Sequence, residues 1–475
     1  MDFSNFLFLQ HEMGIIALFV ILFFCDVVGS KEKGWFYPVA LGLFAIFTVW
    51  GFCPKPMGEA FGGMFVSTPI TSVMKNVLNI GTLLVFLQSY RWLNSEGVKQ
   101  NRSEFFIVTL STILGMYLMV SAGNFMMLYI GMEMASIPVA CLVALNKWQE
   151  KSAEAGVKFV FISALASAVT LFGVSFLYGS TGTLYFADMA KELFSTPLSI
   201  LGLVFFFAGL GFKLSLVPFH LWTADVYEGA PTSVTAYLSV ISKGAAAFAL
   251  MFVMMKVFGS MIVEWQGIVW VISIVTITLG NLFALRQSDI KRFFAFSSIS
   301  QAGYIVLGVL ANNDLGMSAI VFYVLIYIFS NLGAFSVISA VEQSNGGDTS
   351  IKAFNGLSKS NPRWAFLMML AVFSLGGIPV FAGFFSKFFM FVAAAKAGFW
   401  VLVFLALVNT VISLYYYLQI VKAMYIDQRE ETAVEKTKAD GYARLAMVIC
   451  LVGIIVVGLA SCIYSYIHTA AIASI

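Results

Sequence analysis

The sequence predicts an all-α protein that crosses a membrane about fourteen times. Three observations lead there. Hydrophobic residues make up 60% of the 475 residues, and the mean hydropathy is +0.92. Charged residues make up 11%, against about 25% in soluble domains. Apolar stretches of about 20 residues, enough to cross about 30 Å of hydrocarbon, recur along the whole chain. A water-soluble globular protein is therefore excluded.

Fourteen apolar segments are predicted to be membrane helices, numbered 1 to 14 in chain order. The first segment lacks the basic residues that begin a signal peptide, since Asp2 and Glu12 are acidic, and we expect it to be retained. The segments are 12–29, 35–52, 76–92, 105–122, 124–146, 152–178, 198–220, 230–257, 264–285, 292–312, 315–342, 363–397, 398–425 and 442–466.

Basic residues are distributed unequally between the predicted loops. The loops after odd-numbered helices hold eighteen Lys and Arg, and the alternate loops hold five: Lys55, Lys75, Lys191, Lys256 and Lys396. The positive-inside rule then predicts a multi-pass protein of the bacterial inner membrane with both termini on the external side. These residues are scattered and the net charge is only +3, so no nucleic-acid partner is expected.

Two of the segments contain helix-breaking residues. Segment 363–397 would reach about 50 Å as one straight helix, and its middle reads SLGGIPVFAGFFSKFF. In segment 198–220, Lys213 follows two glycines and precedes Pro218. We expect broken helices 7 and 12. Because five helices separate them, they fit corresponding members of two inverted five-helix repeats, helices 4–8 and 9–13, with the ion site at the breaks.

The chain is accordingly divided into four parts. Residues 1–104 hold helices 1 to 3 and an ordered external loop, 53–75, to which no activity is assigned. Residues 105–257 form the first repeat and 258–425 the second. Residues 426–475 hold a cytoplasmic loop and helix 14.

Four lysines fall within predicted spans: Lys158, Lys213, Lys243 and Lys387. A cation at the centre of a span costs about 2.5–3.5 kcal/mol on insertion scales, so such a residue is expected to face a cavity or a partner. Glu133 is the acid that the sequence places near the middle of a span. A desolvated ammonium releases its proton more readily, and a nearby carboxylate opposes that release. A lysine with a movable acidic neighbour is therefore a candidate proton switch.

Three stretches resemble the antiporter-like subunits of the proton-pumping NADH:quinone oxidoreductase, respiratory complex I. They are GLGFKLSLVPFHLWTADVYEGAPTSVTAYLSVISKGAAAFAL, QSDIKRFFAFSSISQAGYI and GGIPVFAGFFSKFFMF. The resemblance covers most of the chain. Within the family the chain is most similar to subunit N, because it ends soon after helix 14, without the long lateral helix of subunit L, and because its twelfth span carries lysine where subunit M usually carries glutamate.

The resemblance implies a fourteen-helix subunit lodged in lipid beside other antiporter-like subunits of the membrane arm. It also implies a non-redox role in proton translocation, with NAD, FMN, iron–sulfur clusters and quinone on other subunits. The matching positions assign proton transfer to Glu133 of helix 5, Lys213 of helix 7, Lys243 of helix 8 and Lys387 of helix 12, and Lys158 fits the helix 6 lysine of subunit N. Gln301 stands where many relatives have histidine, and an amide can hold water but cannot titrate.

Other functional classes of membrane protein have to be considered, some with the same fold and some that give the lysines no role. A subunit of a multi-chain Na⁺/H⁺ antiporter, or of a membrane-bound hydrogenase-like complex, is the main alternative, and a passive channel or spacer is another. Na⁺ prefers several oxygen ligands, whereas four lysines and one glutamate favour protons. Five cysteines without CxxC spacing and three histidines predict no metal or redox group on this chain. Co-purifying partners would discriminate between these classes.

Overall fold

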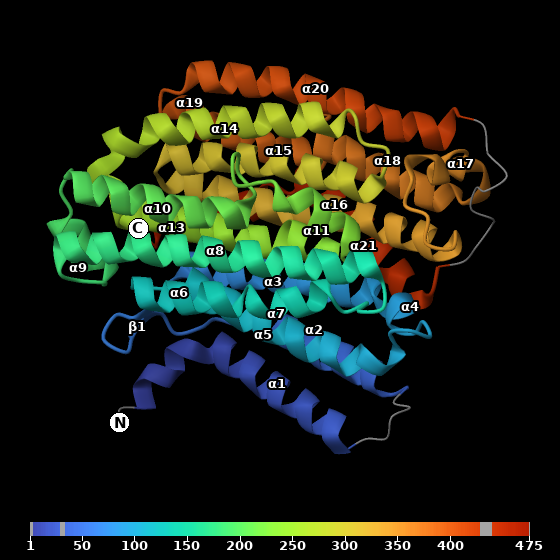
Figure 1. Ribbon diagram of the computed structural model, residues 1–475, viewed down its shortest axis with the longest axis horizontal. Helices are drawn as coiled ribbons and strands as arrows, with labels where there is room; N and C mark the ends of the chain where they lie inside the picture. Colours follow the sequence, from blue (N-terminus) through green and yellow to red (C-terminus); the bar gives the residue numbers. More distant parts are fainter. Residues whose placement is uncertain (1–2, 29–33, 428–438, 475) are drawn as a thin grey trace.

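The computed structural model describes residues 3–28, 34–427 and 439–474. Its helices run roughly along the long axis of the molecule (Figure 1). In these residues twelve helices are long and apolar enough to cross a membrane, and two shorter apolar helices, α2 (Phe36–Gly51) and α18 (Pro362–Gly376), accompany them. The predicted all-α, multi-pass fold is confirmed, and the number of about fourteen spans is approximate.

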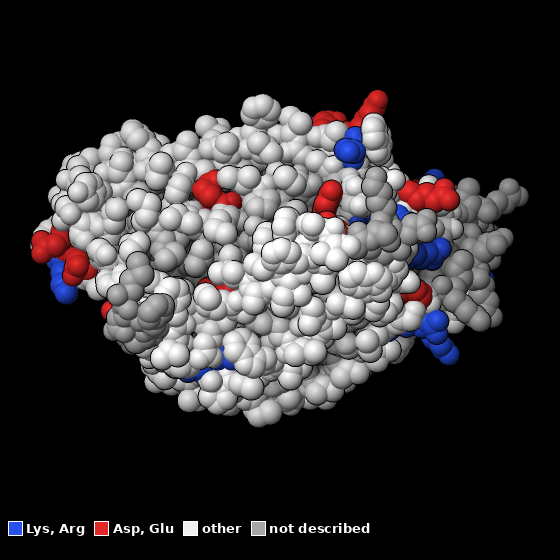
Figure 2. Space-filling model, turned by 90° about the horizontal axis from the view of Figure 1, so that it is seen from below, with Lys and Arg blue, Asp and Glu red and all other residues white. Residues whose placement is uncertain are grey.

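The surface has the charge distribution of a membrane protein. Figure 2 shows one face on which Lys, Arg, Asp and Glu gather toward the two ends, while the broad middle carries few of them. Large apolar side chains are also exposed on helices at the periphery, for example Phe404 and Val411 of α20 (Trp400–Tyr425). Such residues are suited to contact with lipid or with neighbouring membrane subunits.

The N-terminal part differs from prediction at helix 3. Thr68 accepts a hydrogen bond from the Thr71 N–H and Pro69 occupies the first turn, so the helix begins seven residues earlier than expected. The predicted external loop 53–75 is therefore wrong over its last residues, and Lys75 lies inside a helix. The elements are η1 (Phe3–Leu9), α1 (Gln10–Val28), α2, β1 (Gly58–Ala60), β2 (Phe65–Ser67), α3 (Pro69–Gln88), α4 (Tyr90–Leu93) and η2 (Lys99–Asn101). The two strands pair antiparallel, with Glu59 opposite Val66.

The next helices correspond to predicted helices 4 to 8. Helix 5 is split in two near Ser136, next to Glu133, and helix 8 contains one turn of π-helix directly before Lys243. The elements are α5 (Arg102–Val120), α6 (Phe125–Met134), α7 (Ile137–Val143), α8 (Glu150–Thr181), α9 (Phe186–Glu192), α10 (Pro197–Leu214), α11 (Trp222–Gly229), α12 (Thr232–Tyr237), the π-helix η3 (Leu238–Ser242), α13 (Lys243–Lys256) and η4 (Phe258–Met261).

The most buried of the remaining helices is α16 (Asp314–Ser344), whose apolar window is fully buried. It packs against α3, α13, α15, α18, α19 and α21. The elements are α14 (Ile262–Ala284), α15 (Ile290–Ala311), α16, η5 (Ile351–Phe354), α17 (Leu357–Ser360), α18, α19 (Ala382–Lys396), α20, α21 (Gly441–Leu459) and α22 (Ser461–Ile472). Most of the predicted cytoplasmic loop before helix 14 lies outside the described residues.

Both predicted helix breaks are present. α18 ends at Gly376 and α19 begins at Ala382, around Pro379. α10 runs through Gly209 and ends at Leu214. Gly209 does not break this helix. It allows close packing, because a Cβ there would stand 1.6 Å from Oγ1 of Thr170 in α8. The two breaks have the five-helix spacing that the inverted repeat requires, and the symmetry of the two halves stays a prediction.

Candidate functional site

Lys213 lies at the C-terminal end of α10, facing the break between α6 and α7. Its Nζ donates a hydrogen bond to the carbonyl oxygen of Met132 at 3.4 Å, and Glu133 is near enough to interact with it electrostatically. No ion pair of 4.0 Å or shorter joins Glu133 to Lys213 in the described part of the chain. One carboxylate oxygen of Glu133 is buried without a hydrogen-bond donor. The two charges are thus neighbours that are not in direct contact.

Lys243 follows the π-helix η3 and is buried at the centre of the molecule. Its Nζ donates to Oγ of Ser298 in α15 at 2.8 Å, and it stands over the ring of Tyr227 at 5.3 Å. His220, in the connection between α10 and α11, is close enough to interact with Lys243 electrostatically. Single π-helical turns inside α-helices are frequent at functional sites, and this one sets the position of Lys243.

Lys387 lies on α19, directly beyond the second helix break. Its Nζ donates to the carbonyl oxygen of Gly376 at 3.4 Å and stands over the Tyr304 ring at 4.7 Å. Gly377 has a φ of +80°, and a Cβ there would stand 3.1 Å from Cδ of Lys387. The end of α18 frees backbone carbonyls that would be bonded inside a continuous helix. Lys213 and Lys387 therefore both donate to carbonyl groups at broken helices.

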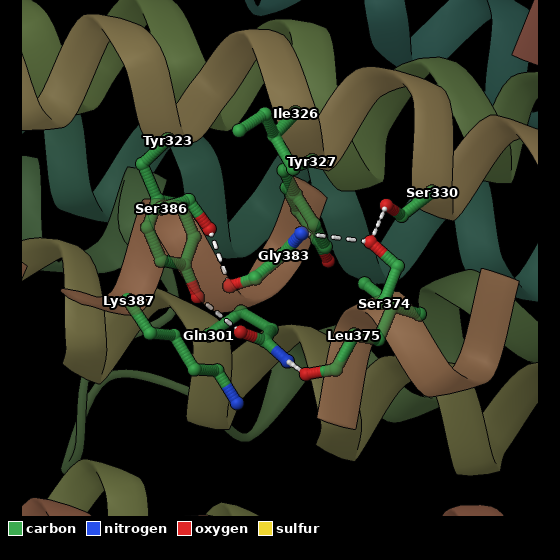
Figure 3. A pocket seen from close by; sticks show the side chains of 10 residues that line it. All are labelled: Gln301, Tyr323, Ile326, Tyr327, Ser330, Ser374, Leu375, Gly383, Ser386 and Lys387. Atoms are coloured by element: carbon green, nitrogen blue, oxygen red, sulfur yellow. Dashed lines mark hydrogen bonds between the residues drawn. The ribbon is translucent and has the colours of Figure 1, made fainter. Parts of the chain in front are cut away.

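Gln301 joins this break to three other helices (Figure 3). Its Nε2 donates to the Leu375 carbonyl at 3.3 Å and to the Tyr417 hydroxyl at 3.2 Å, and its Oε1 accepts a hydrogen bond from Tyr323. In a continuous helix the Leu375 carbonyl would accept from residue 379, which is proline and has no N–H. The amide of Gln301 supplies the missing donor.

A small cavity lies between Gln301 and Lys387 (Figure 3). Its volume is about 10 Å³, the space of about one water molecule. Polar groups line it, among them the hydroxyls of Tyr323, Ser330, Ser374 and Ser386. The arrangement provides enough polar partners to hold a water molecule beside the lysine.

Neighbouring serines of α15 link Lys243 to this cluster. Ser298 accepts from Lys243, and the adjacent Ser297 shares a hydrogen bond of 2.5 Å with the Tyr417 hydroxyl. Tyr417 in turn accepts from Gln301, which lines the cavity at Lys387. Polar side chains thus lie between the central lysine and Lys387, but in the described residues no hydrogen bond joins Ser298 to Ser297.

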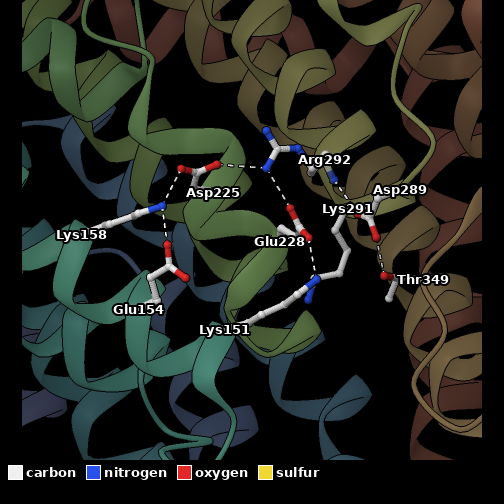
Figure 4. Close-up of polar contacts among 9 residues, drawn as sticks. All are labelled: Lys151, Glu154, Lys158, Asp225, Glu228, Asp289, Lys291, Arg292 and Thr349. Carbon is white, nitrogen blue, oxygen red and sulfur yellow. Dashed lines mark hydrogen bonds and ion pairs between the residues drawn. The ribbon is translucent and has the colours of Figure 1, made fainter.

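Lys158 does not lie with the other three lysines. Its side chain is 39% exposed and contacts Glu154 at 2.6 Å and Asp225 at 2.9 Å. Arg292 contacts both Asp225 at 2.9 Å and Glu228 at 2.8 Å, and Lys151 contacts Glu228 at 2.8 Å (Figure 4). These six side chains, here called the ion-pair network, line a cavity of about 160 Å³: Lys151, Glu154, Lys158, Asp225, Glu228 and Arg292.

Two carboxylates of the network are held in their charged form. The hydrogen bond from Lys158, with a second from Arg292, lowers the pKa of Asp225 below its ordinary value. Burial raises the pKa of Glu228, but hydrogen bonds from Lys151 and Arg292 outweigh burial and lower it overall. Asp289 caps the start of α15, because its Oδ1 accepts from the backbone N–H groups of Lys291 and Arg292.

Sequence reasoning missed buried cations that it assigned to loops, among them Lys75 and Lys291. Lys75 forms an ion pair of 2.6 Å with Glu12, and both residues are buried. Lys291 is buried too and donates to the Ala230 carbonyl at 2.7 Å. Both were counted as loop residues. The signal that could have found Lys75 is Thr68 followed by Pro69, a typical helix start.

Comparisons with known proteins identify the family. A family model described as NADH:quinone oxidoreductase/Mrp antiporter, TM, matches residues 122–413. The chain is 60% identical over 472 residues to the NADH-quinone oxidoreductase subunit N of Azobacteroides pseudotrichonymphae, covering 99% of this chain and 98% of that protein. The chain belongs to the subunit N family of NADH-quinone oxidoreductases. The predicted resemblance is confirmed.

Solved structures support the same family and fold. The subunit N family chain superposes with a TM-score of 0.80 on a chain of respiratory complex I from Thermus thermophilus, at 29% identity and covering 95% and 97% of the two chains. A chain of the Mrp complex from Dietzia, with a TM-score of 0.83 and 21% identity, covers 99% and 97% and shares the fold. The chain is thus an antiporter-like, multi-pass membrane subunit of an oxidoreductase complex, with other membrane-arm subunits as partners. This prediction is better supported than the Na⁺/H⁺ antiporter alternative.

Proposed function

We propose that this subunit translocates protons through Glu133, Lys213, Lys243 and Lys387, driven by electron transfer on other subunits that hold NAD, FMN, iron–sulfur clusters and quinone. The observation that supports this most is a set of three lysines inside the helix bundle: Lys243 and Lys387 are buried, Lys213 is partly buried, and polar side chains lie between Lys243 and Lys387. Each lysine has a neutral oxygen as its nearest hydrogen-bond partner: Met132 O, Ser298 Oγ and Gly376 O. A lysine without a bound counter-charge can lose its proton at a modest cost.

We place the cytoplasmic side at the end of the molecule that carries α4 and α17, as the loop charges predict (Figure 1). The ion-pair network then lies on that side, and its cavity admits water to Lys158 and Asp225. Lys158 has a proton-uptake role in this scheme. It exchanges hydrogen-bond partners with water at the mouth of the path and does not store a proton in the dry interior.

Glu133 and Lys213 form the switch. When the carboxylate approaches, it stabilises the ammonium of Lys213. When it withdraws, burial favours the neutral amine and the proton leaves. The separation of the two charges in this structure fits the withdrawn arrangement, in which Lys213 is held by a backbone carbonyl alone.

The proton then passes toward the second half of the chain. Lys243 receives it beside His220, and Ser298, Ser297 and Tyr417 lead to Gln301. Gln301 does not titrate. It orients the hydroxyl groups and a water molecule in the cavity, so that Lys387 can accept the proton there.

Replacing Lys387 with alanine tests the proposal. Lys387→Ala should assemble, since loss of a buried charge lowers the cost of its helix. It should lower both proton translocation and quinone-linked NADH oxidation, because tight coupling stalls electrons when protons cannot move. Lys396→Ala, which removes an exposed lysine from the same helix, is the matched control. Unchanged translocation in an assembled Lys387→Ala complex would remove Lys387 from the path.

A further inference from the structure

A second pair of opposite charges is buried among the N-terminal helices, near Lys243 of the path proposed above. Glu12 lies on α1 and Lys75 on α3, and each residue is 1% exposed. Lys75 Nζ stands 2.6 Å from Oε1 of Glu12, but both carboxylate oxygens of Glu12 are buried and neither receives a hydrogen bond. The carboxylate therefore has one ionic partner and two oxygens without a hydrogen-bond donor.

Polar and aromatic groups from several neighbouring elements lie around the pair. His11 of α1 is buried and within 3.3 Å of Asn76 Oδ1, and Asn76 donates to the carbonyl of Gly51 at the end of α2. Lys75 lies over the rings of Phe65 in β2, at 4.9 Å, and Tyr117 in α5, at 5.7 Å. Tyr117 donates to Asn79, one turn further along α3. The titratable groups at the site are His11, Glu12, Lys75 and Tyr117, and Lys55 interacts with His11 from the loop after α2.

A gain in folding stability alone does not explain why this ion pair is buried. Desolvating two charges often costs as much as their attraction returns, and hydrophobic residues of similar size in place of a buried pair are often neutral or stabilising. Ionisable residues inside membrane helices usually serve transport or proton transfer. The lack of a hydrogen-bond donor to either oxygen of Glu12 adds to the cost and leaves a site for a proton.

The pair lies between the central lysine and one end of the molecule. Met74, next to Lys75, reaches the neighbourhood of Gly244, next to Lys243, where a Cβ would stand 3.5 Å from the Met74 side chain. On its other side the pair is covered by the hairpin β1–β2, whose residue Phe65 lies against Lys75. Lys75 is about 9 Å along α3 from the start of this helix at Pro69. In the topology proposed above, the hairpin end is external.

We infer that Glu12 and Lys75 form a proton-release station on the external side of this subunit. This inference rests on the proposed function. Lys75 gives a proton to Glu12, so that an N–H bond breaks, an O–H bond forms and both groups become neutral. Glu12 then releases the proton to external water and regains its negative charge. The neutral amine of Lys75 takes the next proton from the lysine path, which restores the ion pair.

Two variants separate proton transfer from a structural role. Lys75→Arg retains a cation beside Glu12, but a guanidinium does not release its proton in proteins. The double variant Glu12→Leu/Lys75→Met replaces the pair with apolar side chains of similar size, which a purely structural site tolerates. Lys191→Arg, at an exposed lysine of α9, is the matched control for arginine. Membrane vesicles carrying each variant complex are assayed for assembly on native gels, NADH-driven acidification and quinone-linked turnover.

The station predicts that both variants assemble and lose acidification and coupled turnover by about 100-fold, the lower end of what a positioned proton-transfer group contributes. Lys191→Arg should retain both activities. Wild-type acidification in either assembled variant would overturn the inference, and so would failure of both variants to assemble, which would show a structural contact. Lys387→Ala is run in parallel. If it alone loses acidification, the release station is wrong and the proposed function stands. If it too is fully active, the proposed function is wrong.

Discussion

Replacing Gln301 with leucine should uncouple the second half of the proton path. The side chain is 1% exposed and makes three hydrogen bonds, which link α15 to α16, α18 and α20. Leucine has a similar volume and makes none of them. Tyr417 keeps its bond to Ser297, so the groups left without a partner are the Leu375 carbonyl and the Tyr323 hydroxyl.

The size of the effect follows from these two groups. A buried polar group that loses its partner costs about 1–3 kcal/mol, which gives about 2–6 kcal/mol for the two. Hydrogen bonds between membrane helices average only about 0.6 kcal/mol, which favours the low end of that range. About 2 kcal/mol added to the barrier of the transfer step to Lys387 slows that step roughly 30-fold.

The assay is NADH-driven acidification of vesicles, measured together with quinone-linked NADH oxidation. Gln266→Leu is the matched control: Gln266 donates to the Leu310 carbonyl at 3.2 Å, and within the described residues it has no hydrogen bond to the groups between Lys243 and Lys387. An assembled Gln301→Leu complex with acidification equal to that of the control would refute the role given to Gln301.

Two further predictions concern topology and pH. In a background without the native cysteines, a cysteine at exposed Lys359 should react only with a reagent that reaches the cytoplasm, and one at exposed Lys191 only from outside; the reverse labelling would invert the proposed orientation. Lys436, in the same predicted cytoplasmic set, lies outside the described residues. Asp225→Asn should lower the thermal stability of the complex at neutral pH, whereas Asp188→Asn, at an exposed pair, should not. Because the pKa of Asp225 is lowered, its contribution is present above the unfolded value of about 3.9 and is lost as pH falls through the folded value, so the difference from wild type should vanish in acid. A difference that persists there would contradict this assignment.

The sequence was most informative where one residue type stands out from its neighbours. A cation within an apolar stretch can be recognised from the sequence alone, which is how Lys213, Lys243 and Lys387 could be predicted. Pro379 likewise indicated the break in helix 12. Their partners could not be predicted. The carbonyls of Met132 and Gly376 become available only because helices end there, and which lysine reaches them depends on packing.

Other parts depended on helix boundaries and faces. The predicted helix 3 begins seven residues after the observed start of α3, which places Lys75 in a loop. Its partner Glu12 is the first residue of predicted helix 1. Lys158 was expected in the interior, but α8 turns this residue outward toward Asp225 and Arg292, which come from α11 and α15. Such contacts bring together residues from three helices, and the hydrophobic pattern of a single segment cannot predict them.

A double-mutant cycle on Glu133 and Lys213 tests the central claim most directly, because it asks whether the two residues act on one proton-transfer step. NADH-driven acidification and quinone-linked turnover are measured for Glu133→Ala, Lys213→Ala and the double variant, with Lys213→Ala combined with exposed Glu104→Ala as the control for independent sites. The account predicts that each single variant is impaired, that the Glu133/Lys213 double variant loses much less than the sum, and that the control pair is additive. Strictly additive losses for Glu133 and Lys213, or a fully active Lys213→Ala complex, would contradict it.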